Sequence, residues 1–71
     1  MDAKTFSQGV LKIERSLFRI AYTYLGHEQD CADAVQDALI ISWEKRHTLR
    51  QPQYFGTWLT RILINCAKQR L

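Results

Sequence analysis

The chain has 71 residues, which is the size of one small domain with a single core. Its content of 46% hydrophobic and 24% charged residues is typical of a folded globular protein and excludes a disordered chain. No apolar run approaches the ~18 residues of a membrane span, and the N-terminus has no signal-peptide pattern. We therefore expect a cytoplasmic protein without membrane insertion, whose net charge of +3 favours an acidic partner.

The charges are distributed unevenly along the chain. Among the seven acidic residues, only Glu44 lies beyond Asp37. The cations of the later part are Lys45, Arg46, Arg50, Arg61, Lys68 and Arg70. The chain is therefore electrically polarised, with an acidic first half and a basic second half.

The apolar pattern predicts a first helix from about residue 5 to 25. Apolar residues recur there at steps of three and four, and Gly26 follows as a plausible C-terminal stop. Gly9 is expected to fray or kink the beginning of this helix, because glycine costs ~1 kcal/mol relative to alanine in a helix. The predicted core stripe is Val10, Ile13, Leu17, Ile20, Ala21, Tyr24 and Leu25.

A second helix is predicted from about residue 28 to 47, and a third from Pro52 to about residue 70, with a short loop from Thr48 to Gln51. Proline fits the first turn of a helix, where its missing N–H costs nothing. Gln51 before it is a poor helix cap. The core stripe of the second helix is Cys31, Val35, Ala38, Leu39, Ser42 and the stem of Arg46, and that of the third is Phe55, Leu59, Ile62, Leu63 and Cys66. The predicted fold is all-α, a compact three-helix bundle.

The two cysteines have neither the number nor the spacing of a disulfide framework or a zinc module. We expect Cys31 and Cys66 to be reduced core residues. His27 and Cys31 stand four residues apart and could form half of a metal site, but no second pair of ligands follows. The sequence therefore predicts no metal and no cofactor.

One face of the second helix, opposite its core stripe, combines carboxylates, an amide and one isoleucine. It holds Asp33, Gln36, Asp37, Ile40 and Glu44. This face could be an ordinary solvated surface with one stray apolar residue. An apolar residue ringed by acidic and polar groups is also typical of an interface whose charges select a basic partner, and we favour this interpretation.

A second polar stripe runs along the third helix, beside its core stripe. It consists of Tyr54, Trp58, Arg61, Asn65 and Lys68, with aromatic residues first and cations later. Aromatic rings stack on unpaired bases, cations hold phosphates and an asparagine amide can read a base edge, so the stripe suits single-stranded nucleic acid. Trp58 could instead be a packing residue at the border of the core. The basic loop residues Lys45, Arg46, His47 and Arg50 would give the stripe a basic entrance, or would simply be solvated.

Several of these motifs, in this order and spacing, resemble region 2 of bacterial RNA polymerase sigma factors, and most of all the extracytoplasmic-function group. The motifs are a Tyr-Leu-Gly helix end, Asp33-Ala-Val-Gln-Asp37, Trp43, Leu49-Arg50 and Phe55-x-Thr57-Trp58-Leu59-x-Arg61-Ile62-x-x-Asn65. The resemblance covers about residues 17 to 71. It implies a non-enzymatic function in transcription initiation.

The resemblance assigns a role to each of the two faces. In sigma factors the acidic helix docks on the clamp helices of the polymerase β′ subunit, which implies this role for Asp33, Gln36, Asp37 and Ile40. The loop and third helix of the family hold the non-template strand of the promoter −10 element with bases extruded from the stack. This implies DNA contacts by the loop from Leu49 to Tyr54, which includes Arg50, and by Arg61 and Asn65. The stripe on the third helix adds Trp58 and Lys68 as candidate DNA contacts. An anti-sigma protein is a further expected partner.

The chain departs from the family pattern at two points. Housekeeping sigma factors have two adjacent tryptophans where the duplex opens, whereas Leu59 follows Trp58 here. Factors of this group also have a second helical domain that recognises the −35 element, and we expect this chain to be an excised domain without it. The alternatives are a helical protein-interaction adaptor without DNA binding and a duplex-reading helix-turn-helix protein, although Tyr54 and Trp58 suit a major-groove helix poorly.

Overall fold

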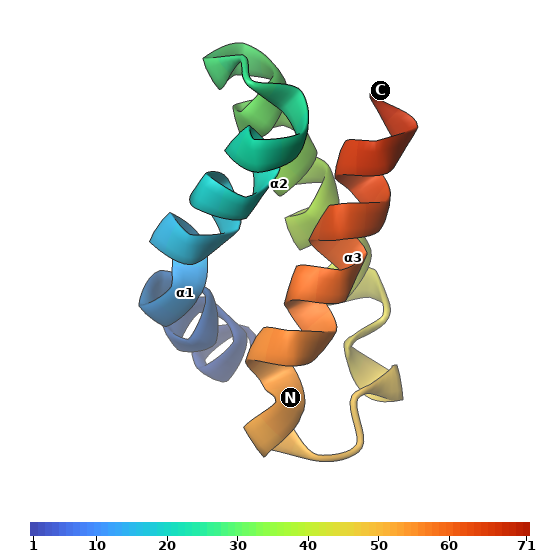
Figure 1. The fold of residues 1–71 in the computed structure, drawn as a ribbon. Coiled ribbons are helices and arrows are strands. Elements are labelled where there is room, and N and C mark those ends of the chain that lie inside the picture. Colours follow the sequence, from blue (N-terminus) through green and yellow to red (C-terminus); the bar gives the residue numbers. More distant parts are fainter.

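A computed structural model describes all 71 residues as three α-helices and two short 3₁₀ segments. The helices are α1 (Ala3–Leu25), α2 (Glu28–Glu44) and α3 (Phe55–Gln69), and the 3₁₀ segments η1 (Arg46–Thr48) and η2 (Pro52–Tyr54) connect α2 to α3. Figure 1 shows successive helices running in opposite directions, so that the C-terminus lies near the α1–α2 connection. The all-α three-helix bundle is confirmed. None of its helices is both long and apolar enough to cross a membrane.

Local chemistry sets both ends of α1. The Asp2 side chain accepts a hydrogen bond of 2.8 Å from the Thr5 N–H and caps the first turn. At the other end Gly26 takes the left-handed conformation, with φ of 63°, and its N–H donates to the Tyr22 carbonyl at 2.9 Å. Because glycine has no Cβ, it adopts this conformation without strain and ends the helix where the sequence predicted.

The connection from α2 to α3 differs from the prediction. Regular α-helix ends at Glu44, and the chain tightens into η1, where the Thr48 hydroxyl donates to the Lys45 carbonyl at 2.7 Å. At Pro52 the chain forms η2 first, and α3 begins only at Phe55. Gln51 gives no side-chain cap, in keeping with its poor capping chemistry.

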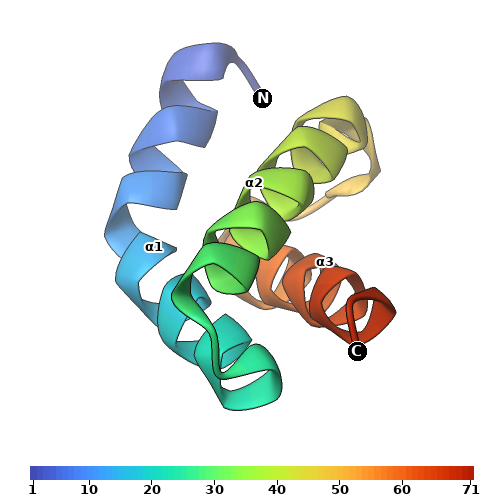
Figure 2. The same ribbon diagram turned by 90° about the horizontal axis from the view of Figure 1, so that it is seen from above.

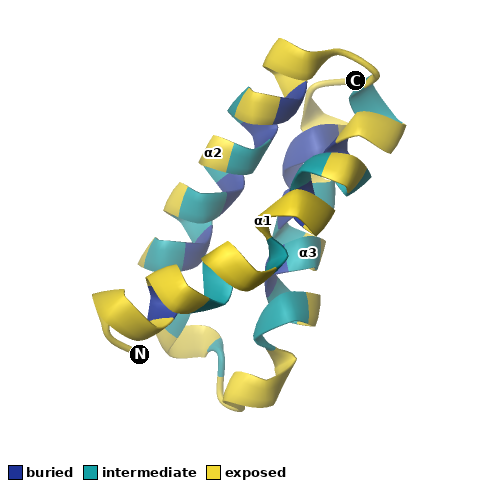
Figure 3. Ribbon diagram, turned by 90° about the vertical axis from the view of Figure 1, so that its left-hand side faces the viewer, coloured by how far each residue is buried: buried dark blue, intermediate teal, exposed yellow.

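The core lies between all three helices, and Figure 3 shows their buried turns facing inward. The buried residues of α2 have small side chains, and leucines from α1 and α3 fill the space between the three helices. The core members are Leu17, Ala21, Cys31, Ala34, Ala38, Leu59, Leu63 and Cys66. Most of the other predicted stripe residues are half-buried and pack against this group. Ser42 is buried as well, and its hydroxyl donates to the Leu39 carbonyl at 2.9 Å.

The buried line of α2 is rotated relative to the predicted one. Ala34 is fully buried, whereas Val35 and Leu39 are only half-buried. Phe6 and Ala67 are buried as well, although neither belongs to a predicted core stripe. The two cysteines are free and buried, as predicted.

An aromatic cluster joins α1, the end of α2 and the start of α3. The Phe6 ring meets Trp43 edge-on at 5.2 Å between centroids and Phe55 at 5.6 Å. The guanidinium of Arg46 lies 3.7 Å from the centre of the Trp43 ring, and its Nη1 donates to the Trp43 carbonyl at 2.7 Å. These contacts hold both ends of the 45–54 connection against the bundle.

Helix α1 is continuous from Ala3 to Leu25, so its beginning does not fray at Gly9. Gly9 provides space for the aromatic cluster. A Cβ at this position would lie 2.8 Å from Cε2 of Phe55, closer than carbon atoms pack. The glycine therefore allows α1 to approach the start of α3.

Gly9→Ala tests this close approach. We expect the free energy of unfolding to fall by about 1 kcal/mol, because overpacking costs ~1–3 kcal/mol and the gain in helix propensity is only ~1 kcal/mol. In a Phe55→Leu background the ring atoms that crowd position 9 are gone, so the same change should stabilise the domain. Urea denaturation of the four proteins gives both values, and equal effects in the two backgrounds would contradict the crowding.

Arg46→Ala tests the contact with Trp43. Loss of the stacked cation and of its hydrogen bond should lower the free energy of unfolding by about 1–2 kcal/mol. Lys45→Ala is the matched control, since Lys45 is exposed and should change stability by less than ~0.5 kcal/mol. Thermal and urea unfolding measure both variants, and equal losses would mean that Arg46 is only a solvated cation.

Candidate functional site

The acidic face of α2 lies partly in solvent and partly against α3. Gln36 is exposed, and Ile40 exposes 53% of its surface although it is a large apolar residue. Asp33 and Asp37 are half-buried, on the side of α2 that turns towards α3. The face is thus an exposed isoleucine and glutamine beside two partly covered carboxylates.

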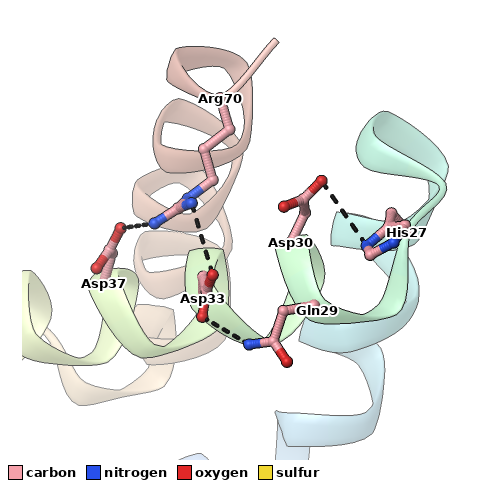
Figure 4. Close-up of polar contacts among 6 residues, drawn as sticks. All are labelled: His27, Gln29, Asp30, Asp33, Asp37 and Arg70. Carbon is pink, nitrogen blue, oxygen red and sulfur yellow. Dashed lines mark hydrogen bonds and ion pairs between the residues drawn. The ribbon is translucent and has the colours of Figure 1, made fainter.

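Arg70, at the C-terminal end of α3, contacts both of these carboxylates (Figure 4). Its Nη2 donates to Oδ2 of Asp37 at 2.8 Å, and its Nη1 lies 3.9 Å from Oδ2 of Asp33. The hydrogen bond to Asp37 raises the pKa of the Arg70 guanidinium, and partial desolvation opposes this effect. The cation therefore persists at every physiological pH.

Arg70 was not among the residues predicted for this face. The two partners of the shorter contact are separated by 33 positions, so no helical periodicity connects them. Only the antiparallel packing of α2 and α3 brings them together. The sequence offered only a general indication of this contact, because it has a basic C-terminal end and an acidic helix in the same small bundle.

A shallow hollow between α2 and α3 adjoins the acidic face. Its volume is about 150 Å³, and it is lined by Asp37, Ile40, Ile41, Cys66 and Gln69. Asn65 and Lys45 line a second hollow that shares Ile41, Cys66 and Gln69 with the first. Burial is the main cause that raises the pKa of the Cys66 thiol, and the nearby Asp37 carboxylate acts in the same direction, so Cys66 is an unreactive wall residue.

The His27 and Cys31 pair does not form half of a metal site. Cys31 is fully buried, whereas His27 is exposed and its Nδ1 lies 3.9 Å from the Asp30 carboxylate. No group of three or more histidine, cysteine, aspartate or glutamate side chains converges anywhere in the chain.

The predicted stripe on α3 and its loop is exposed except for one member. Tyr54 exposes 57% of its surface, and Arg50, Arg61, Asn65 and Lys68 are exposed too. Trp58 is half-buried, packs against the core and lies 6.0 Å from the Phe55 ring between centroids. From Tyr54 to Lys68 the stripe extends over about 20 Å at 1.5 Å per residue.

The acidic face of α2 and the stripe on α3 lie in different parts of the bundle. Figure 2, seen from above, shows α2 and α3 crossing at an angle beside α1. The aromatic end of the α3 stripe lies next to the 45–54 connection, whereas Asp33 and Asp37 of the acidic face lie near the middle of α2, beside the end of α3. The molecule therefore offers an acidic surface with an exposed isoleucine and a separate line of aromatic, amide and cationic groups.

The family match and the two relatives described below all belong to one class of protein, the RNA polymerase sigma factors. The family model for sigma-70 region 2 matches residues 10–71. The RNA polymerase sigma-H factor of Pseudomonas aeruginosa is 31% identical over 70 residues, which are 99% of this chain and 36% of that protein. The RNA polymerase sigma factor SigV of Bacillus subtilis is 26% identical over 54 residues, which are 76% of this chain and 32% of that protein.

The chain spans about a third of the length of these two relatives. No solved structure matches it at a significant level. The family match covers residues 10–71 of 71 and includes both faces described above, together with the helices that carry them. The chain therefore belongs to the sigma-70 region 2 family.

Proposed function

We propose that this domain acts in transcription initiation by docking on the β′ clamp helices of RNA polymerase and by binding the non-template strand of the promoter −10 element. The polymerase contact is the α2 face of Asp33, Gln36, Asp37 and Ile40. The DNA contact comprises Arg50, Tyr54, Trp58, Arg61, Asn65 and Lys68. The role is one of binding, without catalysis, and its place is the cytoplasm.

The observation that carries the polymerase contact is the exposure of Ile40 among carboxylates. Ile40 has 53% of its surface in water, so a partner that covers this side chain stabilises the complex through apolar burial. The neighbouring Asp37 accepts a hydrogen bond from the Arg70 guanidinium, and Asp33 forms a longer ion pair with it, so both carboxylates are within reach of a cation. An apolar centre with a polar and acidic rim suits a basic helical partner.

The exposed line along α3 supports the DNA contact. Tyr54 presents a ring on which a base can stack, Arg61 and Lys68 can hold phosphates, and the Asn65 amide has both a donor and an acceptor. None of these four side chains makes a hydrogen bond or an ion pair within the domain, so each is available to a ligand.

Trp58 has a smaller part in the proposed DNA contact than Tyr54. It packs against Phe55 and the core, so that only part of its side chain meets solvent. Leu59 is fully buried, so this domain has one partly available indole where housekeeping factors have two adjacent tryptophans. Stacking on Tyr54 and phosphate contacts would then provide most of the free energy that offsets base extrusion. An anti-sigma protein would cover the same two faces.

Ile40→Gln tests the polymerase contact. Because the isoleucine is half exposed, the change should leave the fold intact and weaken binding to a β′ clamp-helix fragment about five- to tenfold through lost apolar burial. Leu11→Gln is the matched control, since Leu11 on α1 exposes 67% of its surface and lies outside the proposed face. Isothermal titration calorimetry measures both, and equal affinities for the two variants would refute the assignment of Ile40.

Tyr54→Ala tests the DNA contact. The wild-type domain should bind a −10 non-template single strand more tightly than its complement or the duplex, with affinity falling as salt rises. Loss of the Tyr54 ring should remove ~1–3 kcal/mol of binding free energy. Tyr22→Ala provides the control, because Tyr22 is exposed to a similar degree, 53% against 57%, on α1. Fluorescence anisotropy reports each affinity, and binding that ignores strand identity would favour the adaptor.

A further inference from the structure

Arg70 covers the carboxylates that the proposed polymerase contact needs. Its two guanidinium nitrogens reach Oδ2 of Asp37 at 2.8 Å and Oδ2 of Asp33 at 3.9 Å (Figure 4). At Asp33 a basic side chain of a partner would approach the same oxygen, since the Gln29 amide already donates to the other one, Oδ1, at 3.0 Å. At Asp37 it would meet a carboxylate whose charge Arg70 already partly neutralises. The site on α2 is therefore partly occupied by a group of the same molecule.

This contact is suited to exchange because all three groups still meet water. The side chains of Arg70, Asp33 and Asp37 expose 33%, 40% and 49% of their surface. Ion pairs at such positions contribute little to stability, and a solvated arginine loses little when it swings away. Arg70 is the C-cap residue of α3.

We propose that Arg70 is an internal competitor of the polymerase for Asp33 and Asp37, displaced by a basic side chain of the clamp helices when the domain docks. The inference rests on the proposed function, since it concerns regulation of the same face. Arg70 lowers the affinity for the clamp helices by up to about fivefold, the equilibrium equivalent of a surface ion pair. It also reduces the negative charge that the free domain presents to unrelated basic surfaces.

Arg70→Gln tests the competition. The variant should bind a β′ clamp-helix fragment two- to fivefold more tightly than wild type in calorimetry. Arg19→Gln is the matched control, because it removes the same charged group from α1, where Arg19 is exposed and has no ion pair. Only a gain that is specific to Arg70 supports competition, whereas equal gains in both variants would reduce the effect to net charge and overturn it.

A double-mutant cycle localises the effect. In an Asp37→Asn background Arg70 loses its charged partner at 2.8 Å and keeps only Asp33 at 3.9 Å, so Arg70→Gln should tighten binding by clearly less than it does in the wild-type background. Arg70→Lys, which keeps the charge but loses the planar fork, should lie between wild type and Arg70→Gln. Circular dichroism confirms that each variant is folded.

The outcomes separate this inference from the proposed function. If wild type binds the clamp fragment and Arg70→Gln binds equally or more weakly, the competition is overturned and the polymerase contact stands. If neither wild type nor any variant binds, the polymerase contact itself fails and the competition fails with it. Weaker binding by Arg70→Gln alone would make Arg70 a direct contact of the polymerase.

Discussion

The small side chains along the buried line of α2 are the constraint on which the rest of this bundle depends. Cys31, Ala34, Ala38 and Ser42 are fully buried, and they leave room for Leu17 of α1 and for Leu59 and Leu63 of α3. A helix with so little volume on its inner side can lie close to two neighbours at once. A domain of 71 residues has few other ways to build one continuous core.

The same constraint shapes the outer surface of α2. With alanines inside, the larger aliphatic residues Val35, Leu39 and Ile41 lie at the flanks, half-buried, and Ile40 is left in solvent. Because α2 buries Ala34 and not Val35, Asp37 lies on the side of the helix that faces α3, where Arg70 contacts it. The exposed isoleucine and the paired carboxylates of the proposed polymerase face thus both result from how α2 packs.

The sequence predicted the helices better than it predicted the contacts between residues that are far apart in the chain. Three helices and the stop at Gly26 followed from periodicity and from a local conformational preference, which need no knowledge of distant residues. The buried line of α2 was misplaced because hydrophobicity favours Val35 and Leu39 over Ala34, whereas helix proximity favours the smaller residue. Phe6 and Arg70 were missed since their partners, Trp43 and Asp37, are far away in the sequence. The exposure of Tyr54 and the half-burial of Trp58 likewise depend on the Phe55 ring and the 3₁₀ segment before it.

The two proposed faces are connected mainly through α3. Its first residue, Phe55, belongs to the aromatic cluster that anchors the 45–54 connection, and its C-cap residue, Arg70, lies on the acidic face of α2. The core between these ends is closely filled, so α3 has little freedom to shift when one partner binds. Under the proposed competition, the contacts within the domain that docking replaces are the two exposed ion pairs of Arg70 with Asp33 and Asp37. Neither ion pair belongs to the core, so exchanging them leaves the packing of the three helices, and with it the α3 stripe, unchanged.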